Sequence, residues 1–587
     1  MLLSSLPRSG VLDMRIAGSG FALACIVALM TGCDAPSPTP VAGVAPQPAG
    51  DYYGTLEPFA SEAVYFVVTD RFVNGDPGND HRDQGGAHPT FDIPLHCPDG
   101  VVAHLGYLGG DFRGLLDNAD YIREMGFSAV WITPIVDNPD EAFSGGDEVT
   151  CTSFLTDRGK AGYHGYWGMD FFRVDEHLPS PGLQFADLTR GLRAKGLKTV
   201  LDIVANHSSP AWSMPQKQPG FGQVFDAAGT LVADHGNLPP QELDPANNPL
   251  QRWYNTTPDL AQLGDFNPDN PAVMDYLVGA YRQWIEQGAA AFRVDTIGHQ
   301  PLEFWNRFAA RIRADHPGFF MFGEAFDYDA NKIAPYTWNE NGHYSVLDFP
   351  MKKAIADAFE KSGGDFAALG AALELENGPF QNPYELATFY DNHDMARFDA
   401  SDAGFIDAHN WLFTARGIPV VYYGSESGFM RGRAEHHGNR NYFGSEGIAA
   451  AREHPIRRQL TRIARARSAS VALQRGLQLD LELAGQRATF YRVFAHAGQA
   501  QTALVLLNKG DEPESFDLGD RLQSGSWRDA LDSTRAPLTI DAGTTHRFEV
   551  APHDVAVWLL DAPVTLPSLR ARLDQLMQGR ERRTTGE

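Results

Sequence analysis

Residues 199–207 read TVLDIVANH, a run of aliphatic and β-branched residues that ends in an asparagine and a histidine. Three later segments follow the same plan: FRVD at 292–295, FGE at 322–324 and YDNHD at 390–394. Near-continuous apolar runs are typical of parallel strands that are buried on both faces. Side chains at the carboxyl ends of such strands meet on one open face of a parallel barrel. The four segments therefore predict a barrel whose chemistry lies at its strand ends.

Strand-like runs alternate with amphipathic stretches through most of the chain, which predicts the α/β class and a (β/α)8 TIM barrel. The expected strands cover 63–69, 129–133, 199–205, 290–294, 319–323, 345–349, 386–390 and 418–423. The clearest helical patterns cover 112–125, 183–195, 271–287 and 302–314.

At 587 residues the chain is long for a single core, so we expect more than one domain. The barrel is predicted in two parts, 53–206 and 265–468. The stretch between them, 207–264, is rich in Pro, Gly, Asn and Gln and lacks a helical period, which indicates a functional insertion. Short alternating runs separated by turn residues predict an antiparallel β-sandwich over 469–562. Residues 563–587 are interpreted as a charged tail, because the segment 566–587 is basic and has a helical pattern without residues that suggest chemistry.

The composition excludes several classes of partner. The chain has 48 Lys and Arg against 74 Asp and Glu, a formal charge of −26, which argues against binding nucleic acid or anionic lipid headgroups. A hydrophobic content of 43% with 11% aromatic residues fits a well-packed globular protein.

The N-terminus predicts a cell-envelope protein. Residues 16–30 are apolar and follow Arg8 and Arg15, a pattern typical of a signal peptide and too short to span a bilayer. They end in MTGC, which resembles the lipobox of bacterial lipoproteins with Cys33 as the lipidated residue. We therefore expect a signal peptide with lipobox at 1–33, a flexible linker at 34–52 and a membrane contact through the lipid anchor alone. The location would be periplasmic or at the cell surface. Cleavage by an ordinary signal peptidase, giving a secreted protein, is the alternative.

Cys97 and Cys151 are the two cysteines of the body of the chain. Outside the cytoplasm they could form a disulfide, whereas two free thiols are the alternative. The sequence does not decide, because pairing depends on the distance between the two Cα atoms.

The carboxylates at the strand ends suit the hydrolysis of an acetal. This reaction needs a proton donor for the leaving oxygen and a second carboxylate for the developing positive charge. Asp295 follows Arg293 by two residues, so strand periodicity places both on one side, where the guanidinium favours an ionised carboxylate. Glu324, at the end of the next strand, suits general acid and base catalysis.

These segments resemble the α-amylase family, glycoside hydrolase family 13, and especially its bacterial α-amylases and cyclodextrin glucanotransferases. The segment YHGYW at 163–167 also matches. The resemblance implies that Asp295 is the nucleophile, Glu324 the acid and base, and Asp394 a third carboxylate that binds sugar hydroxyls. It further implies that the insertion is the family's domain B and that five residues bind substrate: His164, Tyr166, His207, Arg293 and His393.

Two oxygen-rich clusters imply Ca²⁺ as a cofactor, since calcium prefers carboxylate, amide and carbonyl oxygens. The first resembles a calcium loop of cyclodextrin glucanotransferases and consists of Asn74, Asp76, Asn79, Asp80, Gly109 and Asp111. The second resembles the family site that ties domain B to the barrel and consists of Asn206, Asp265 and the backbone carbonyl of His299. The alternative for the first cluster is an ordinary turn, because Asn, Asp and Gly are also turn residues.

The expected function is that of a monomeric, retaining α-glucan hydrolase that cleaves α-1,4-glucosidic bonds in starch or maltodextrins by double displacement. The alternatives are a cyclodextrin glucanotransferase or other 4-α-glucanotransferase, a cyclomaltodextrinase-like hydrolase, and a glucan-binding protein without catalysis. Residues 257–261 lack the aromatic side chain that cyclodextrin glucanotransferases carry there, and Gly298 replaces a common lysine. Both departures favour hydrolysis over cyclisation.

Overall fold

The computed structural model describes residues 52–361 and 363–585. The predicted signal peptide and lipobox, and residues 34–51 of the predicted linker, lie outside the described residues. No helix within the described part of the chain is long and apolar enough to cross a membrane.

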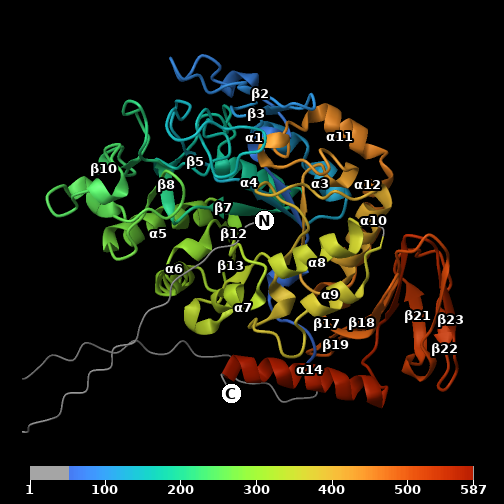
Figure 1. The fold of residues 1–587 in the computed structure, drawn as a ribbon. Helices are drawn as coiled ribbons and strands as arrows, with labels where there is room; N and C mark the ends of the chain where they lie inside the picture. The colour runs from blue at the N-terminus through green and yellow to red at the C-terminus, as the bar shows by residue number, and fades with distance from the viewer. Residues whose placement is uncertain (1–51, 362, 586–587) are drawn as a thin grey trace, which may run out of the picture. The chain divides into compact units, whose positions relative to one another are not determined.

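Eight parallel strands form the centre of the fold and confirm the predicted barrel (Figure 1). They are hydrogen-bonded in the order β14-β13-β12-β7-β4-β1-β16-β15. A parallel bridge between Leu347 and Ala387 joins the two ends, so the barrel is nearly closed. The strands are β1 (Val64–Val67), β4 (Ala129–Ile132), β7 (Lys198–Ile203), β12 (Ala289–Val294), β13 (Phe320–Gly323), β14 (Ser345–Val346), β15 (Ala387–Thr388) and β16 (Ile418–Tyr422).

Helices follow the strands, with α5 and α6 on one side of the barrel and α10 and α12 on the other (Figure 1). The single helix predicted over 112–125 is divided into two at Asn118, whose side-chain amide donates to the Gly114 carbonyl over 2.8 Å. The helices are α1 (Thr69–Phe72), α2 (Phe112–Asp117), α3 (Ala119–Glu124), α4 (Phe185–Ala194), α5 (Pro271–Glu286), α6 (Leu302–Asp315), α7 (Ala330–Ile333), α8 (Phe349–Phe359), α9 (Ala367–Ala372), α10 (Asp402–Thr414), α11 (Gly444–Arg452), α12 (Pro455–Ser468), α13 (Val471–Arg475) and α14 (Pro567–Thr585).

The interior of the barrel is filled by aromatic side chains that form the floor of the site described below. Phe66 of β1 and Trp131 of β4 are fully buried and stack with their ring centroids 3.8 Å apart. The indole nitrogen of Trp131 donates to Asp202 Oδ2 over 2.9 Å. Burial of these rings contributes to stability, and the indole N–H also satisfies a carboxylate that would otherwise be costly to bury.

The insertion at 207–264 leaves and re-enters the barrel at one place. Its first strand, β8 (His207–Pro210), pairs antiparallel with β11 (Leu263–Asp265), and a hairpin of β9 (Gln223–Phe225) and β10 (Leu231–Asp234) lies between them. A separate apolar core contains Phe143, Trp167, Met214, Phe221 and Leu263.

A second long connection contributes to that core. Phe143 and Trp167 belong to the segment between β4 and α4, which also holds the ribbon β5 (Val136–Asp137) and β6 (Asp170–Val174). The wall beside the barrel is therefore built from two connections that are far apart in the sequence.

The C-terminal part forms the expected antiparallel domain. Six strands are paired in the order β17-β18-β19-β24-β21-β22, and β20 pairs with β23. The strands are β17 (Leu477–Ala484), β18 (Arg487–His496), β19 (Gln499–Asn508), β20 (Glu514–Asp517), β21 (Gly525–Asp529), β22 (Leu538–Ile540), β23 (Arg547–Val550) and β24 (Asp554–Leu560).

Helix α14 occupies most of the segment that we interpreted as a charged tail. Leu569, Leu573 and Leu576 are buried in the apolar cluster of the C-terminal domain. The hydroxyl of Tyr53 donates to Asp574 Oδ1 over 2.6 Å. A row of leucines with helical spacing accounts for this packing.

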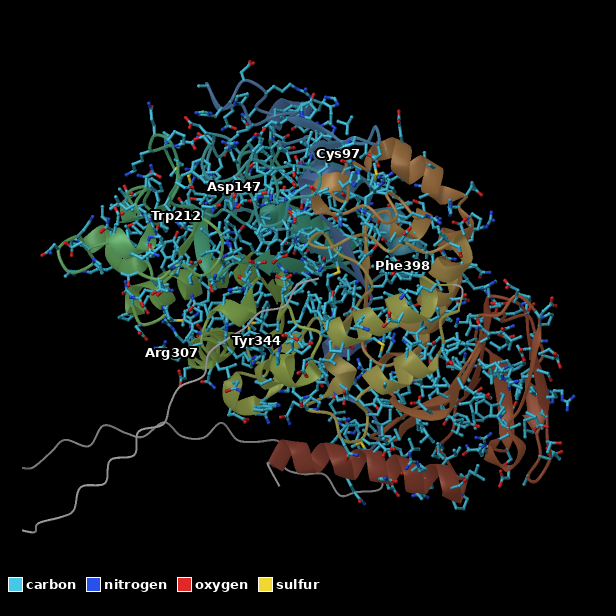
Figure 2. All side chains as sticks on the ribbon, viewed as in Figure 1. Cys97, Asp147, Trp212, Arg307, Tyr344 and Phe398 are labelled. Carbon is cyan, nitrogen blue, oxygen red and sulfur yellow. A yellow bond between two sulfur atoms is a disulfide. The ribbon has the colours of Figure 1, made fainter. Side chains whose placement is uncertain are left out.

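Cys97 and Cys151 form a disulfide, with their Cα atoms 5.8 Å apart (Cys97 is labelled in Figure 2). The pairing that the sequence left open is thus present. It joins the hairpin of β2 (Pro94–His96) and β3 (Val102–His104) to the long connection after β4.

Candidate active site

The side chain of Arg293 is the centre of the site. It is fully buried, with Nη1 2.9 Å from Asp202 Oδ1 and 2.8 Å from Asp295 Oδ1. Its Nη2 lies 2.7 Å from Glu324 Oε2. The strand register explains this grouping, because Arg293 on β12 is level with Asp202 on β7 and with Phe322 on β13. One cation therefore joins carboxylates from three adjacent strands.

Asp202 is a site residue to which the sequence analysis assigned no role. It accepts a hydrogen bond from the Tyr166 hydroxyl over 2.8 Å, in addition to those from Arg293 and Trp131. Burial raises its pKa to about 7, against the attraction of Arg293. The signal in the sequence was a lone acidic residue inside an apolar strand, which must find partners when it is buried. We infer that Asp202 orients Arg293 and Tyr166.

Glu324 lies where a proton donor is needed. Burial raises its pKa well above the usual range; Arg293 opposes this shift, and the charges of Asp394 and Asp295 add to it. Its Oε2 also accepts a weak hydrogen bond of 3.4 Å from the Thr296 backbone. A carboxylic acid that keeps its proton near neutral pH can serve as a general acid.

Asp394 is held by a residue that the sequence analysis missed. Arg440 donates from Nη2 to Asp394 Oδ1 over 2.6 Å and from Nε to the His393 carbonyl over 3.0 Å. Glu435 lies 3.1 Å from the same guanidinium and 3.3 Å from Lys160 Nζ. Arg440 and Asp394 are 46 residues apart, and no local pattern marked the arginine as a partner.

Three histidines surround the carboxylates and are buried: His164, His207 and His393. Burial lowers the pKa of each of them, so their rings are neutral near pH 7. A neutral imidazole has one donor and one acceptor nitrogen, which suits hydrogen bonding to hydroxyl groups. The ring of Tyr166 stacks on His393 with centroids 5.3 Å apart.

The predicted residues share one cavity of about 410 Å³. Asp295, Glu324 and Asp394 line it together with all of the predicted substrate-binding residues except Arg293, which lies beneath, bound to two of the carboxylates. Its remaining lining includes Phe154, Leu155 and Phe326. The cavity thus combines carboxylates, neutral histidines and apolar side chains, as a neutral polyhydroxylated ligand requires.

The first predicted metal cluster has oxygen atoms that need a partner. The side-chain oxygens Oδ1 of Asn74 and Asn79 are buried without any hydrogen-bond partner. Asn74 Nδ2 donates to Asp80 Oδ1 over 2.7 Å, and a Cβ at Gly109 would lie 2.2 Å from that nitrogen and 2.4 Å from that oxygen. These four residues form a tight oxygen-rich cradle that fits a hard cation.

The two other carboxylates of this cluster are already engaged by the backbone. Asp111 accepts from the backbone nitrogens of Gly75, Asp76 and Gly114, and so caps α2. Asp76 accepts from the Gly78 nitrogen over 3.0 Å. Both carboxylates hold the loop in shape as a turn residue would.

The second predicted cluster also contains an unsatisfied oxygen. Asp265 Oδ1 is buried without a partner, and burial raises the pKa of this carboxyl to about 7. The strand register places Asp265 opposite His207, beside Asn206. Asp259, which the sequence analysis did not assign, binds His299 Nδ1 over 2.8 Å and donates its backbone N–H to Asp265 Oδ2 over 3.0 Å. The side-chain atoms of Asn206 and Asp265 that would bind a metal are oxygens, which a hard cation prefers.

Comparison with known proteins identifies the family of this chain. Residues 66–461 match the family model described as the alpha amylase catalytic domain. The chain belongs to the α-amylase family. The family that the sequence motifs indicated is therefore confirmed.

Relatives with two activities resemble this α-amylase-family chain. It is 29% identical over 490 residues to an α-amylase of Streptomyces lividans, covering 70% of this chain and 52% of the relative. It is also 29% identical over 536 residues to a cyclomaltodextrin glucanotransferase of Niallia circulans, covering 87% of this chain and 69% of the relative. The chain thus spans about half the length of the first relative and about two thirds of the second.

Solved structures give the same two activities. An Anoxybacillus α-amylase aligns with a TM-score of 0.66 at 26% identity, over 86% of this chain and 99% of that chain. A cyclomaltodextrin glucanotransferase with a three-domain ABC distribution aligns with a TM-score of 0.69 at 28% identity, over 85% and 99%. The named relatives and structures include both a hydrolase and a transferase, so the comparisons show the family and do not decide between these two reactions.

Proposed function

We propose that this protein is a retaining α-glucan hydrolase that cleaves α-1,4-glucosidic bonds in starch or maltodextrins. The observation that carries the proposal is the contact of Arg293 with both Asp295 and Glu324 in a cavity that Asp394 also lines. The guanidinium donates a hydrogen bond of 2.8 Å to Asp295, while burial favours the protonated form of Glu324. A retaining mechanism requires an oriented nucleophile and a protonated general acid at the start.

In the first step, Asp295 attacks the anomeric carbon and the bond from this carbon to the leaving oxygen breaks. Glu324 gives its proton to that oxygen, so the leaving glucan departs with a free hydroxyl. In the second step, Glu324 takes a proton from water, the water oxygen bonds to the anomeric carbon, and Asp295 is released. Asp394 and the neutral histidines hold sugar hydroxyls during both steps. Asp202 keeps Arg293 in place.

A 4-α-glucanotransferase is the second candidate, and the three-domain cyclomaltodextrin glucanotransferase at a TM-score of 0.69 favours it. In that reaction a sugar hydroxyl replaces water in the second step. A cyclomaltodextrinase-like hydrolase would use the same chemistry on a cyclic substrate. The stretch 257–261, without an aromatic side chain, supports hydrolysis over cyclisation.

Time-resolved product analysis on starch, maltoheptaose and β-cyclodextrin distinguishes these reactions. A hydrolase releases new reducing ends in step with bond cleavage and yields shorter linear products. A transferase yields cyclic products or chains longer than the maltoheptaose supplied. Rapid opening of β-cyclodextrin, faster than starch cleavage, would indicate a cyclomaltodextrinase. No cleavage of any of the three would overturn the proposal.

We also propose that calcium is a cofactor. The buried, unpaired oxygens of Asn74, Asn79 and Asp265 support this proposal, because one cation at each cluster would satisfy them. Asn74, Asn79, Asp80 and the Gly109 loop would hold one ion, and Asp265 with the Asn206 and His299 region would hold another. Bound there, calcium would stabilise two loops next to the barrel and take no part in the bond-breaking steps.

We further propose that the protein is a lipoprotein of the bacterial cell envelope, anchored through Cys33. The motif MTGC at 30–33 and the Pro-, Ala- and Gly-rich stretch after it support this location. Multiple acyl chains would give stable attachment to a membrane.

A further inference from the structure

Two adjacent apolar side chains are exposed at the mouth of the catalytic cavity. Phe154 and Leu155 expose 63% and 54% of their surface, the largest values among the exposed large hydrophobic residues of the described chain. Both line the same cavity as Asp295 and Glu324. Neighbouring exposed apolar groups beside a functional cavity are typical of a binding surface.

The backbone that presents these side chains is held in an uncommon conformation. Leu155 has a φ angle of +54°, in the left-handed region that branched residues rarely adopt. The turn before it is closed by two hydrogen bonds of 2.8 Å between Thr150 and Ser153. A strained residue that the surrounding structure maintains, next to a cavity, points to a functional constraint.

The Cys97–Cys151 disulfide links the loop that carries Phe154 and Leu155 to the β2–β3 hairpin. Cys151 precedes Phe154 by three residues. Cys97 directly follows β2, in the connection between β2 and β3. That hairpin is bound to the segment that carries Arg440: Asn441 Nδ2 donates to the Val102 carbonyl over 2.9 Å. The apolar pair is thereby connected to the part of the chain that holds Asp394.

The other end of the loop is bound to the same segment by charge. Lys160 is buried and places Nζ 3.0 Å from Asp157 Oδ1 and 3.3 Å from Glu435 Oε1. Glu435 in turn contacts Arg440. The loop carrying Phe154 is therefore fixed on both sides of the apolar pair.

We propose that Phe154 and Leu155 form an apolar platform for one glucose ring of a bound α-glucan, beyond the ring held at the carboxylates, and that the Cys97–Cys151 disulfide sets its position. A glucose ring has apolar C–H faces and polar edges, so an exposed aromatic side chain can cover one face while water solvates the hydroxyls. The inference rests on the proposed function. It makes this loop a determinant of chain-length preference.

The test compares kcat/KM for maltoheptaose with kcat/KM for maltotriose. In Phe154→Ala we expect the ratio of the two values to fall about five- to tenfold, the loss of roughly one ring contact. Phe154→Trp should preserve the ratio because it keeps a flat apolar face. The double variant Cys97→Ser/Cys151→Ser should also lower the ratio, because the disulfide no longer holds Phe154 and Leu155 in position.

Leu56→Ala is the matched control, since Leu56 is 40% exposed but lies outside the lining of this cavity. It should leave the ratio unchanged. An active wild-type enzyme whose ratio does not change in Phe154→Ala would overturn the platform and leave the proposed function standing. A fall in Phe154→Ala without a fall in the double serine variant would overturn the role of the disulfide. A wild-type protein without activity on either substrate would overturn the proposed function and this inference together.

Discussion

Arg293 Nη1 donates to Asp295 Oδ1 over 2.8 Å, and only Val294 separates the two residues in the chain. The two-residue spacing places both side chains on the same side of the strand end. The guanidinium thereby orients the carboxyl group of the proposed nucleophile. Because Nη2 of the same arginine lies 2.7 Å from Glu324, one cation orients both the nucleophile and the proton donor.

Asp295→Asn should abolish turnover and retain glucan binding. The amide keeps the size of the side chain but cannot form the covalent intermediate, so kcat on maltoheptaose should fall by orders of magnitude. Steady-state kinetics and calorimetric titration with maltoheptaose measure the two effects. A variant that keeps more than about a tenth of the wild-type kcat would rule out Asp295 as the nucleophile.

Glu324 should set the alkaline limb of the pH profile. A general acid must carry its proton, so activity should be lost as pH rises through the pKa of Glu324, and the raised pKa moves that loss to higher pH than for an ordinary glutamate. Glu324→Gln should lower kcat on maltoheptaose by about 10²–10⁴-fold. The loss should be smaller on α-maltosyl fluoride, because fluoride leaves without protonation. Equal losses on both substrates would contradict the role of proton donor.

Arg293→Met should destabilise the fold. Removing the guanidinium leaves Asp202, Asp295 and Glu324 buried without their cation, which should cost about 3–5 kcal/mol of the free energy of unfolding. Arg311→Met is the control, because Arg311 pairs with Asp275 at the surface and should contribute no more than about 1 kcal/mol. Thermal unfolding of both variants measures the difference. Equal melting temperatures would show that the buried cluster does not depend on Arg293.

Removal of calcium should lower the melting temperature and the activity together, and added calcium should restore both. A metal that binds only the folded state stabilises it in proportion to the logarithm of its concentration over Kd. Asn79→Ala and Asp265→Ala should each bind one equivalent less by metal analysis, while Asn339→Ala at the exposed turn η7 (Asn339–Asn341) should match the wild type. An unchanged melting temperature in excess EDTA, with no calcium found by metal analysis, would contradict both proposed calcium sites.

Cys33→Ser should move the protein from the membrane fraction to the soluble fraction. Lipidation requires the thiol, and residues 34–52 separate Cys33 from the barrel, so activity per molecule should stay near that of the wild type. Fractionation with and without detergent, followed by activity assays, provides the measurement. Equal recovery of both forms in the soluble fraction would favour ordinary secretion.

The sequence by itself determined the barrel and the positions of its three carboxylates. Each strand is a short apolar run, and each carboxylate follows its run directly, so both features are local. The eight predicted strands are all present, although β14 and β15 have only two residues each and are shorter than their apolar runs. Family motifs added the histidines and Tyr166, which the structure brings into one cavity.

Only the tertiary structure decided which groups meet across long separations in the chain. Asp202 binds Arg293 at a separation of 91 residues, and Arg440 reaches Asp394 over 46. The Cys97–Cys151 bond and the shared core of the two long connections depend on loop paths in the same way. Periodicity reports which face of an element is buried, but not which distant element covers it. Those partners are selected when the whole chain packs, because a buried charge or an apolar face is stable only with a neighbour that the local sequence does not specify.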